Sequence, residues 1–504
     1  MLRKTIKELG LHSIIYSLGG FASVIASIIL LPIYTRFLSR TDYGIIEVID
    51  TIRAQLIVIL LAGFVPAMAK FYNEANSEDK KRDVVGTSFW FIVVSGLVWI
   101  ALLFLFDNAL AEQFLTSAKF VVYIDLGIIL LFIQAFLTTG ESYLNIRKKS
   151  QLFLIASLSR LGLNIAANLY FIIVLRLQAR GMLYGELLSS VIVGIVLVGY
   201  LAKTNGLRFR SRLLVNMLKF GLPFIPTTFS ATLMHKADRL LLPRFTSLQD
   251  VGVYGLGYRF PFMLNSLLLD SFGRIWYASV MYEIAAQKDY QKIYAKVTTY
   301  FVTVYVVAQY LLIIMAPTIV RILAAPEYFQ AWKVVQVIGI GMCFYSFHNF
   351  FVTGAFIKNK TWYLPVSHIL AACINIALNW YLLPRYGYMA AAWNTVITYL
   401  VFSILNFFLF RKVYPIPFEF GRLGFLLGIG IGLVLINNAL FLQNSILEFF
   451  KELVFSTILP LLLVFGPYLE HDEKESLAEE LKKIHPALAS FYTRLQQKSW
   501  IKKK

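Results

Sequence analysis

The chain has 504 residues, of which 58% are hydrophobic and only 15% are charged. Soluble proteins carry about 45–50% apolar and about 25% charged residues, so a water-soluble chain of this length could not bury so much apolar surface. The composition therefore excludes a disordered chain, a disulfide-stabilised scaffold and a soluble nucleic-acid-binding protein. It favours a membrane protein, in which the net charge of +19 has to be interpreted from its distribution along the chain.

Fourteen apolar segments are each long enough to cross a bilayer as a helix, which needs about 20 residues. In chain order they are the ranges 10–35, 43–69, 84–106, 119–142, 152–175, 181–202, 214–243, 252–283, 294–316, 331–357, 362–383, 387–410, 421–442 and 446–468. The seventh, eighth and tenth are interrupted by polar residues. The gaps leave no room for a soluble domain, and only residues 469–504 are predicted to form a water-facing tail.

The basic residues lie mainly in every second loop. Lys80–Lys81–Arg82, Arg147–Lys148–Lys149 and Arg411–Lys412 fall on the same side as the N-terminus, whereas the opposite loops hold one or two basic residues each. By the positive-inside rule both termini are predicted to be cytoplasmic. Most of the +19 is then a topology signal with added attraction to anionic lipids, and no nucleic-acid partner is predicted.

Two sequence patterns recur at nearly the same spacing. The motif R-F-x-S-x-x-D-x-G occurs at Arg36–Gly44 and at Arg244–Gly252, and N-I-A-x-N-x-Y occurs at Asn164–Tyr170 and at Asn375–Tyr381. Each copy falls at the same place in a six-span unit, which predicts an internal repeat. The predicted organisation is a six-helix lobe, a second parallel six-helix lobe, two additional helices and a cytoplasmic tail, over residues 1–202, 203–412, 413–468 and 469–504.

Arg53 in the second span and Arg259 in the eighth span are the main candidate ligand-binding residues. They follow the repeated Asp42 and Asp250 by similar distances, so they are expected at similar depth in the two halves. Charged residues within spans are costly and usually face a cavity or a partner. Two facing arginines predict a cationic cavity for phosphate, because a guanidinium binds two phosphate oxygens at once and stays charged.

Other charged residues interrupt the seventh and eighth spans. Lys236, Asp238 and Arg239 lie at the end of the seventh span, and Arg259, Asp270 and Arg274 form one stripe of the eighth at 100° per residue. An alternative stays open, because Asp50–Arg53 and Asp270–Arg274 also have the spacing of ion pairs within one helix. In that case the acids only neutralise neighbouring bases.

Paired asparagines mark spans five and eleven. Asn164 and Asn168 share a helix face, as do Asn375 and Asn379. They are typical of hydrogen bonding between helices, and sugar contact by Asn168 and Asn379 is the alternative. The sequence contains no P-loop, no metalloprotease motif, no nucleophile elbow and no long outer loop with clustered carboxylates, so neither an enzyme nor a metal site is predicted.

The segment Met217–Pro226, followed by Ala237–Leu242, resembles the seventh-span hallmark of bacterial and archaeal polysaccharide flippases of the O-antigen type (Wzx-like). These belong to the superfamily of the multidrug and toxic-compound exporters (MATE-like) and the lipid II flippase. The motif at Arg36–Gly44 is similar to the first hairpin of that family. The resemblance implies an all-α polytopic membrane protein with two parallel six-helix repeats and two C-terminal helices.

The resemblance also implies a function. Such a protein carries a polyprenyl-diphosphate-linked oligosaccharide to the outer leaflet of a bacterial or archaeal plasma membrane for cell-surface polysaccharide biosynthesis. By position, Arg53 and Arg259 correspond to cavity arginines of lipid II flippases. Those proteins also use an arginine in the first span, which this chain lacks between Leu11 and Tyr34; Lys236 and Arg239 are the candidates to replace it.

The expected mechanism is alternating access by rocking of the halves 10–202 and 214–410. Pro223, Pro226 and Pro261 can break the seventh and eighth helices and are candidate hinges. No cofactor is expected, and Asp238 and Asp270 are the candidates for coupling to Na⁺ or H⁺.

The expected partners are the lipid-linked glycan, membrane lipids and polysaccharide polymerase machinery, and the chain is expected to be a monomer. Two alternatives stay open at this point. One is a cation-coupled multidrug exporter of the same fold, and the other is a membrane glycan polymerase or ligase.

Overall fold

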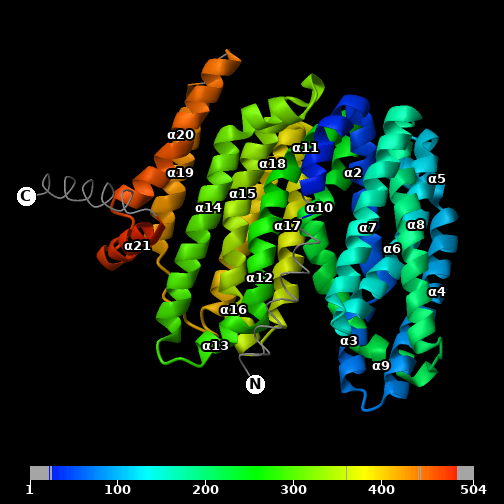
Figure 1. Ribbon diagram of the computed structural model, residues 1–504. Coiled ribbons are helices and arrows are strands. Elements are labelled where there is room, and N and C mark those ends of the chain that lie inside the picture. Colours follow the sequence, from blue (N-terminus) through cyan, green and yellow to red (C-terminus); the bar gives the residue numbers. More distant parts are fainter. Residues whose placement is uncertain (1–21, 23–24, 359, 441, 443, 485–504) are drawn as a thin grey trace, which may run out of the picture. The chain divides into compact units, whose positions relative to one another are not determined.

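The computed structural model describes residue 22 and residues 25–484, apart from 359, 441 and 443. Over these residues the regular structure is entirely helical, as Figure 1 shows. The first predicted span, 10–35, lies largely outside the described residues, and its end falls in a short apolar helix, Ile25–Phe37.

The helices follow the predicted spans closely. Up to residue 205 they are α2 (Arg40–Leu61), α3 (Phe64–Glu74), α4 (Glu78–Phe104), α5 (Asp107–Leu115), α6 (Val121–Ile146), α7 (Ser150–Asn168), a π-helical turn η2 (Leu169–Val174) and α8 (Gln178–Asn205). The next section holds α9 (Ser211–Gly221), a 3₁₀ turn η3 (Leu222–Phe224), α10 (Ile225–Phe245), α11 (Leu248–Asn265), π-helical η4 (Ser266–Asp270), α12 (Ser271–Ile275), π-helical η5 (Trp276–Val280) and α13 (Met281–Ala285). The last are α14 (Tyr290–Leu323), α15 (Ala331–Phe351), α16 (Thr353–Ile357), α17 (Tyr363–Tyr386), α18 (Tyr388–Phe410), α19 (Phe420–Ala439), α20 (Ser445–Phe465) and α21 (His471–Ile484).

Among the described residues, ten helices are long and apolar enough to cross a membrane. The other predicted spans have identifiable interruptions. The seventh is divided by η3 and the eighth by two π-helical turns. The fourteenth corresponds to α20, which carries Glu448, Lys451 and Glu452. The structure therefore shows a polytopic all-α membrane fold, and the count of fourteen spans stays a prediction.

The helices form two compact units. One comprises residues 1–286 and 320–415, and the other comprises residues 287–319 and 416–504. All candidate site residues named above belong to the first unit. The second unit holds most of α14 together with α19, α20 and α21. The predicted division into two six-helix lobes, two further helices and a tail stays a prediction.

The two copies of R-F-x-S-x-x-D-x-G form the same local structure. Ser39 caps α2 by accepting a bond from the Asp42 amide at 3.2 Å, and Ser247 caps α11 by accepting from the Asp250 amide at 3.1 Å. Such side-chain caps satisfy amides that the first helical turn leaves without partners. The repeat in the sequence is therefore also a structural repeat at these two helix starts.

The glycines that end the two motifs let α2 and α11 cross closely. A Cβ added to Gly44 would lie 1.9 Å from the Leu248 carbonyl oxygen, and one added to Gly252 would lie 2.1 Å from the Arg40 carbonyl oxygen. Arg40 and Leu248 occupy equivalent motif positions, so the crossing is reciprocal. Only glycine leaves room for this backbone contact.

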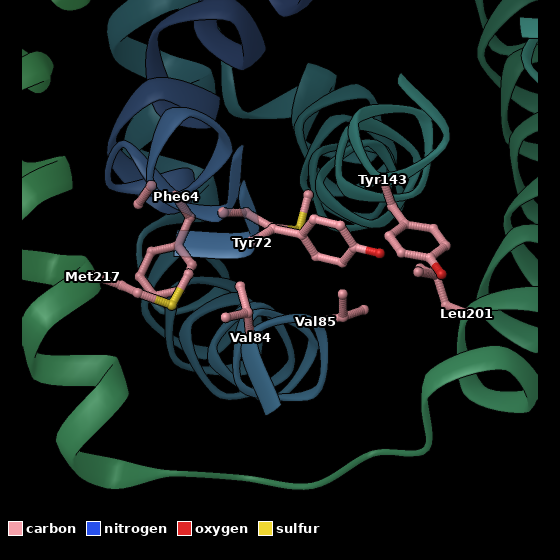
Figure 2. Packing of buried hydrophobic residues seen from close by; sticks show 9 residues of the cluster. Phe64, Tyr72, Val84, Val85, Tyr143, Leu201 and Met217 are labelled. Atoms are coloured by element: carbon pink, nitrogen blue, oxygen red, sulfur yellow. The ribbon is translucent and has the colours of Figure 1, made fainter. Parts of the chain in front are cut away.

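A hydrophobic cluster shows where α9 packs. Met217 of α9 lies beside Phe64 of α3, in a cluster completed by buried residues of α4, α6 and α8 (Figure 2). The cluster also includes Tyr72 of α3, Val84 and Val85 of α4, Tyr143 of α6 and Leu201 of α8. The start of the seventh predicted span thus packs on helices of the first half, whereas α10, beyond η3, packs on α17 and α2.

Candidate substrate-binding cavity

A polar cavity of about 500 Å³ lies within the first unit. Helices α2, α6, α7, α8 and α11 contribute its walls. Its charged residues are Asp50, Arg53, Glu141, Arg160, Glu186 and Arg259, and its uncharged polar residues are Gln134, Ser157, Asn164, Asn168, Ser189 and Ser190. Arg53 and Arg259, predicted from the two halves of the chain, therefore line the same cavity.

The Arg53 guanidinium is held by acceptors from three helices. Its Nη1 and Nη2 donate to the two carboxylate oxygens of Glu186 at 2.8 and 2.6 Å. Nη1 also donates to Asp50 at 3.2 Å, and Nη2 donates to the Gln134 side-chain oxygen at 3.1 Å. This two-bond arrangement is the geometry that arginine also uses for phosphate. Only 7% of the residue is exposed.

Arg259 differs from Arg53 in its partner. Its Nη1 donates to the Tyr43 hydroxyl at 2.5 Å, and its guanidinium lies 5.8 Å from the centroid of that ring. No carboxylate among the described residues lies within ion-pair distance of it. Arg259 is therefore a cavity cation that is held by a neutral group and can accept an anion.

The cavity as a whole is not cationic, which corrects the prediction from Arg53 and Arg259 alone. Three arginines line it, and so do three acids, Asp50, Glu141 and Glu186. Arg160 pairs with Glu141 at 3.6 Å. Buried charges are stable only when other helices supply counter-charges, and a pattern within one helix does not show which helices will do so.

Lys236 and Arg239 do not line this cavity. Arg239 is buried, and its Nε donates to Glu47 of α2 at 3.0 Å while its Nη1 lies 3.3 Å from Asp238. Its guanidinium also lies 4.2 Å from the centroid of the Tyr258 ring. Lys236 has no ion-pair partner within the part of the chain that the structure describes.

The carboxylate of Asp238 has a basic partner and a hydrogen-bond donor. It is 2% exposed, pairs with Arg239 and accepts a hydrogen bond from the Tyr254 hydroxyl. A carboxylate with such partners is well satisfied in the protein interior.

Asp270 and Arg274 do not continue a straight stripe from Arg259. The 100° rule assumes an uninterrupted α-helix, but η4 covers Ser266–Asp270 and turns by a smaller angle per residue. Asp270 accepts from the Asn265 side chain at 3.4 Å, and Arg274 donates to Ser271 at 3.4 Å. Both are exposed, and the ion pair that their spacing allowed is absent among the described residues.

The paired asparagines form matching hydrogen bonds in the two repeats. Asn168 donates to Asn164 at 2.9 Å, and Asn379 donates to Asn375 at 3.1 Å. Asn168 also donates to the Tyr34 hydroxyl at 2.8 Å and lines the cavity. Asn379 is fully buried and is not among the cavity-lining residues, so only the first-half pair is placed to contact a ligand there.

The candidate hinge prolines lie at two kinds of position. Pro223 lies in η3 and Pro226 in the first turn of α10, where the seventh predicted span is divided. Pro261 lies inside α11, four residues before its end, and π-helical η4 follows. Proline removes a backbone donor and disturbs the preceding turn, so Pro226 gives the break between α9 and α10 a local cause. Pro261 does not explain η4, which follows it.

Two contacts of the cavity arginines were not expected from the sequence. Gln134 of α6 and Tyr43 of α2 carry no charge, so a pattern of ionisable residues within spans does not include them. Tyr43 does have a signal, because it stands inside the repeated motif where the second copy has Val251. The two repeats therefore differ here, and only the first-half copy supplies a hydroxyl at this position.

The family model of polysaccharide biosynthesis proteins matches residues 33–337, which is more than half of the chain. The chain belongs to this family. It is also 23% identical over 481 residues to the uncharacterized membrane protein MJ1068 of Methanocaldococcus jannaschii, covering 88% of this chain and 90% of that protein.

Solved structures show the same fold. Lipid II flippase MurJ in an inward closed conformation matches with a TM-score of 0.71 at 13% identity, over 90% of this chain and 98% of that one. An inward-facing multidrug resistance transporter of the MATE family, in the MOP superfamily, matches with a TM-score of 0.65 at 16% identity. The match covers 77% of this chain and 94% of that one. The resemblance inferred from the sequence is thereby confirmed, with a flippase and transporter fold rather than an enzyme fold.

Proposed function

We propose that the protein is a flippase that moves a polyprenyl-diphosphate-linked oligosaccharide across the plasma membrane by alternating access, for cell-surface polysaccharide biosynthesis. One observation carries the proposal: arginines from the two halves of the chain, Arg53 and Arg259, line one polar cavity. A diphosphate is the anionic group that two facing guanidinium groups suit best.

The cavity wall fits the rest of such a ligand. Its volume lies within the range of about 300–1,000 Å³ that small-ligand sites have, which accommodates a diphosphate with its first sugars. Asn164, Asn168, Ser157 and Ser189 offer donors and acceptors for hydroxyl groups. The polyprenyl chain stays in the bilayer, where its transfer to a polar cavity would cost free energy.

The proposed conformational change separates contacts between the two halves. The Arg239–Glu47 pair joins α10 to α2 and must break or lengthen when α10 moves. Pro223 and Pro226 supply the bend between α9 and α10, and Pro261 supplies one in α11. Asp238 and Asp270 remain the coupling candidates for Na⁺ or H⁺, and Asp270 is the more accessible of the two.

The cellular location and the partners of the protein follow from the same proposal. The protein resides in a bacterial or archaeal plasma membrane with both termini cytoplasmic, acts as a monomer, binds membrane lipids and delivers its product to the polymerase machinery. Lys236 and Arg274, which have no ion-pair partner among the described residues, are proposed to meet the anionic ligand outside the cavity.

Reconstitution tests this function directly. The protein is placed in liposomes that carry a fluorescent polyprenyl-diphosphate oligosaccharide, and a membrane-impermeant quencher added outside reports the fraction that stays protected. Wild-type protein is expected to change this fraction with time, and Arg259→Ala is expected to do so much more slowly. Movement no faster than in protein-free liposomes would exclude a flippase.

A second candidate is a cation-coupled multidrug exporter, because Asp50, Glu141 and Glu186 could also bind an organic cation. The same liposomes loaded with ethidium and given a Na⁺ or H⁺ gradient discriminate between the two functions. Gradient-driven ethidium movement without lipid movement would favour the exporter.

A further inference from the structure

We propose that Glu186 is an internal competitor of the lipid diphosphate: its carboxylate occupies Arg53 in the empty cavity, binding of the diphosphate displaces it, and the displaced carboxylate takes up a proton from water. This inference rests on the proposed function for the identity of the ligand. It adds to that function a specific residue that controls access to Arg53 and links binding to proton uptake.

Every Nη donor of Arg53 is already used. A guanidinium has five N–H donors, two on each Nη and one on Nε. The four Nη donors match the four acceptor oxygens, two on Glu186, one on Asp50 and one on Gln134. The Nε donor is buried with no acceptor among the described residues. A phosphate can therefore bind Arg53 only by replacing an acceptor that is already there.

Glu186 is the acceptor that a phosphate would replace. It alone spans both Nη atoms, and its distances of 2.6 and 2.8 Å are shorter than the 3.2 Å to Asp50. Two oxygens of a phosphate need this same pair of donors. The Glu186 side chain is 36% exposed, so it has room to turn away from Arg53 without movement of α8.

Charge balance makes the displaced carboxylate take up a proton. The cavity holds three arginines and three acids, so it has no net formal charge before the ligand enters. A diphosphate adds at least two negative charges. A charged carboxylate that has lost its partner in a partly buried site costs free energy. Protonation at a carboxylate oxygen of Glu186 removes one of these charges.

The other charged groups near Arg53 do not take this role. Asp50 keeps its single bond from Nη1, and Glu141 of α6 is paired with Arg160 of α7. Arg259 has no carboxylate partner among the described residues, so it is available before Arg53 is. Glu47 of α2 is paired with Arg239, and Lys236 of α10 is a cation. The expected order is capture at Arg259, then exchange of Glu186 for phosphate at Arg53.

Calorimetry on the full-length protein in nanodiscs tests the proposal, with farnesyl diphosphate as the probe. Titrations at pH 6, 7 and 8, in buffers with different ionisation enthalpies, give the affinity and the number of protons taken up. The terminal phosphate of farnesyl diphosphate itself titrates in this pH range in every variant, so the proton taken up by Glu186 is the difference between wild type and Glu186→Gln. Wild-type protein is expected to take up more protons on binding than Glu186→Gln. Glu186→Gln is expected to bind at least tenfold more tightly at pH 8.

Glu141→Gln is the matched control, because it removes an acid from the same cavity that does not contact Arg53. It is expected to take up protons on binding as the wild-type protein does. Glu186→Gln protein that elutes as wild type on size exclusion but binds no more tightly overturns the inference, and so does equal proton uptake in wild type and Glu186→Gln. If wild type and Glu186→Gln both fail to bind farnesyl diphosphate, the proposed function fails together with the inference.

Discussion

At the scale of single residues, the two cavity arginines are not equivalent. Arg53 is held by Glu186, Asp50 and Gln134, whereas Arg259 is held by the neutral Tyr43 hydroxyl. Both arginines lie in largely apolar segments, and the sequence places an acid at ion-pair spacing only beside Arg53, at Asp50. The neighbouring helices determine which of them can receive an anion without first losing a counter-charge.

Arg259→Lys is expected to slow lipid movement about tenfold or more at low substrate concentration. A lysine keeps the charge but loses the planar fork, and a lost charge-assisted hydrogen bond costs about 1.5–3 kcal/mol. The initial rate in liposomes measures the effect. The control is Arg176→Lys in the exposed loop before α8, and equal rates for the two variants would exclude a role for the Arg259 fork.

Glu473 gives a residue-scale prediction for pH. The side chain of Glu473 in α21 is desolvated, which raises its pKa, but bonds from Arg422 at 2.8 Å, Tyr300 at 2.7 Å, the Glu470 amide and Lys296 outweigh this and lower the pKa from 4.5 to about 2. A depressed pKa adds stability above about pH 4.5, and this stability is lost as the pH falls toward about 2.

The docking of α21 is therefore expected to hold at pH 6 and to weaken between about pH 4.5 and 2. Hydrogen exchange of α21, corrected for intrinsic rates, measures this. Glu473→Gln is expected to raise the exchange of α21 at pH 6. Glu475→Gln, whose described partner is the exposed His471, is the control; equal protection in the two variants would contradict a stabilising role of Glu473.

At the scale of elements, the reciprocal glycine crossing ties α2 to α11. Gly44→Ala is expected to lower the thermal unfolding temperature by several degrees or to separate the helix starts, because the added methyl group would overlap the Leu248 carbonyl. Gly199→Ala in α8 is the control, since a Cβ there meets nothing within 4 Å, and it is expected to be neutral or slightly stabilising. Differential scanning fluorimetry compares them, and equal melting curves would show that the crossing can relax.

The break between α9 and α10 joins two packing environments. α9 packs with α3 in the first-half cluster, and α10 packs with α17. Leu222–Phe224 form a 3₁₀ turn that contains Pro223, and Pro226 lies in the first turn of α10. This gives the predicted hinge at Pro223 and Pro226 a structural setting.

Pro223→Ala combined with Pro226→Ala is expected to slow lipid movement while leaving farnesyl diphosphate affinity unchanged. The substitutions restore backbone donors and favour one continuous helix that bends less easily. Flipping rates in liposomes and calorimetric affinities separate the two effects. Pro384→Ala near the end of α17 is the control, and a double variant that flips lipid at the wild-type rate would exclude the hinge.

At the scale of the whole molecule, the charge distribution makes a prediction about orientation. In a background without Cys343 and Cys373, Asn76→Cys between α3 and α4 is expected to be protected from an impermeant maleimide added outside intact cells. Glu112→Cys in α5 is expected to be labelled. Both positions are exposed in the fold, so the reversed pattern would place the termini on the outer side.

Much of the fold could be predicted from the sequence because hydropathy acts on each segment alone. A bilayer requires an apolar length of about 20 residues, and a chain region such as α18, with Tyr388–Phe410, satisfies this without reference to its neighbours. The predicted spans differ from the observed helices where a segment is not uniformly apolar. η3 and η4 interrupt the seventh and eighth spans, and their prolines and polar residues make the segments ambiguous.

The sequence by itself determined the membrane class, the family resemblance and the repeated motifs, because these depend on local composition and on residue identity. It also predicted that Arg53 and Arg259 lie at similar depth, which stays a prediction. Only the tertiary structure decided that both face one cavity, that Glu186 holds Arg53, that Tyr43 holds Arg259 and that Arg239 belongs to another contact. The physical reason is that a buried charge is defined by its partners, and here those partners come from helices far apart in the chain.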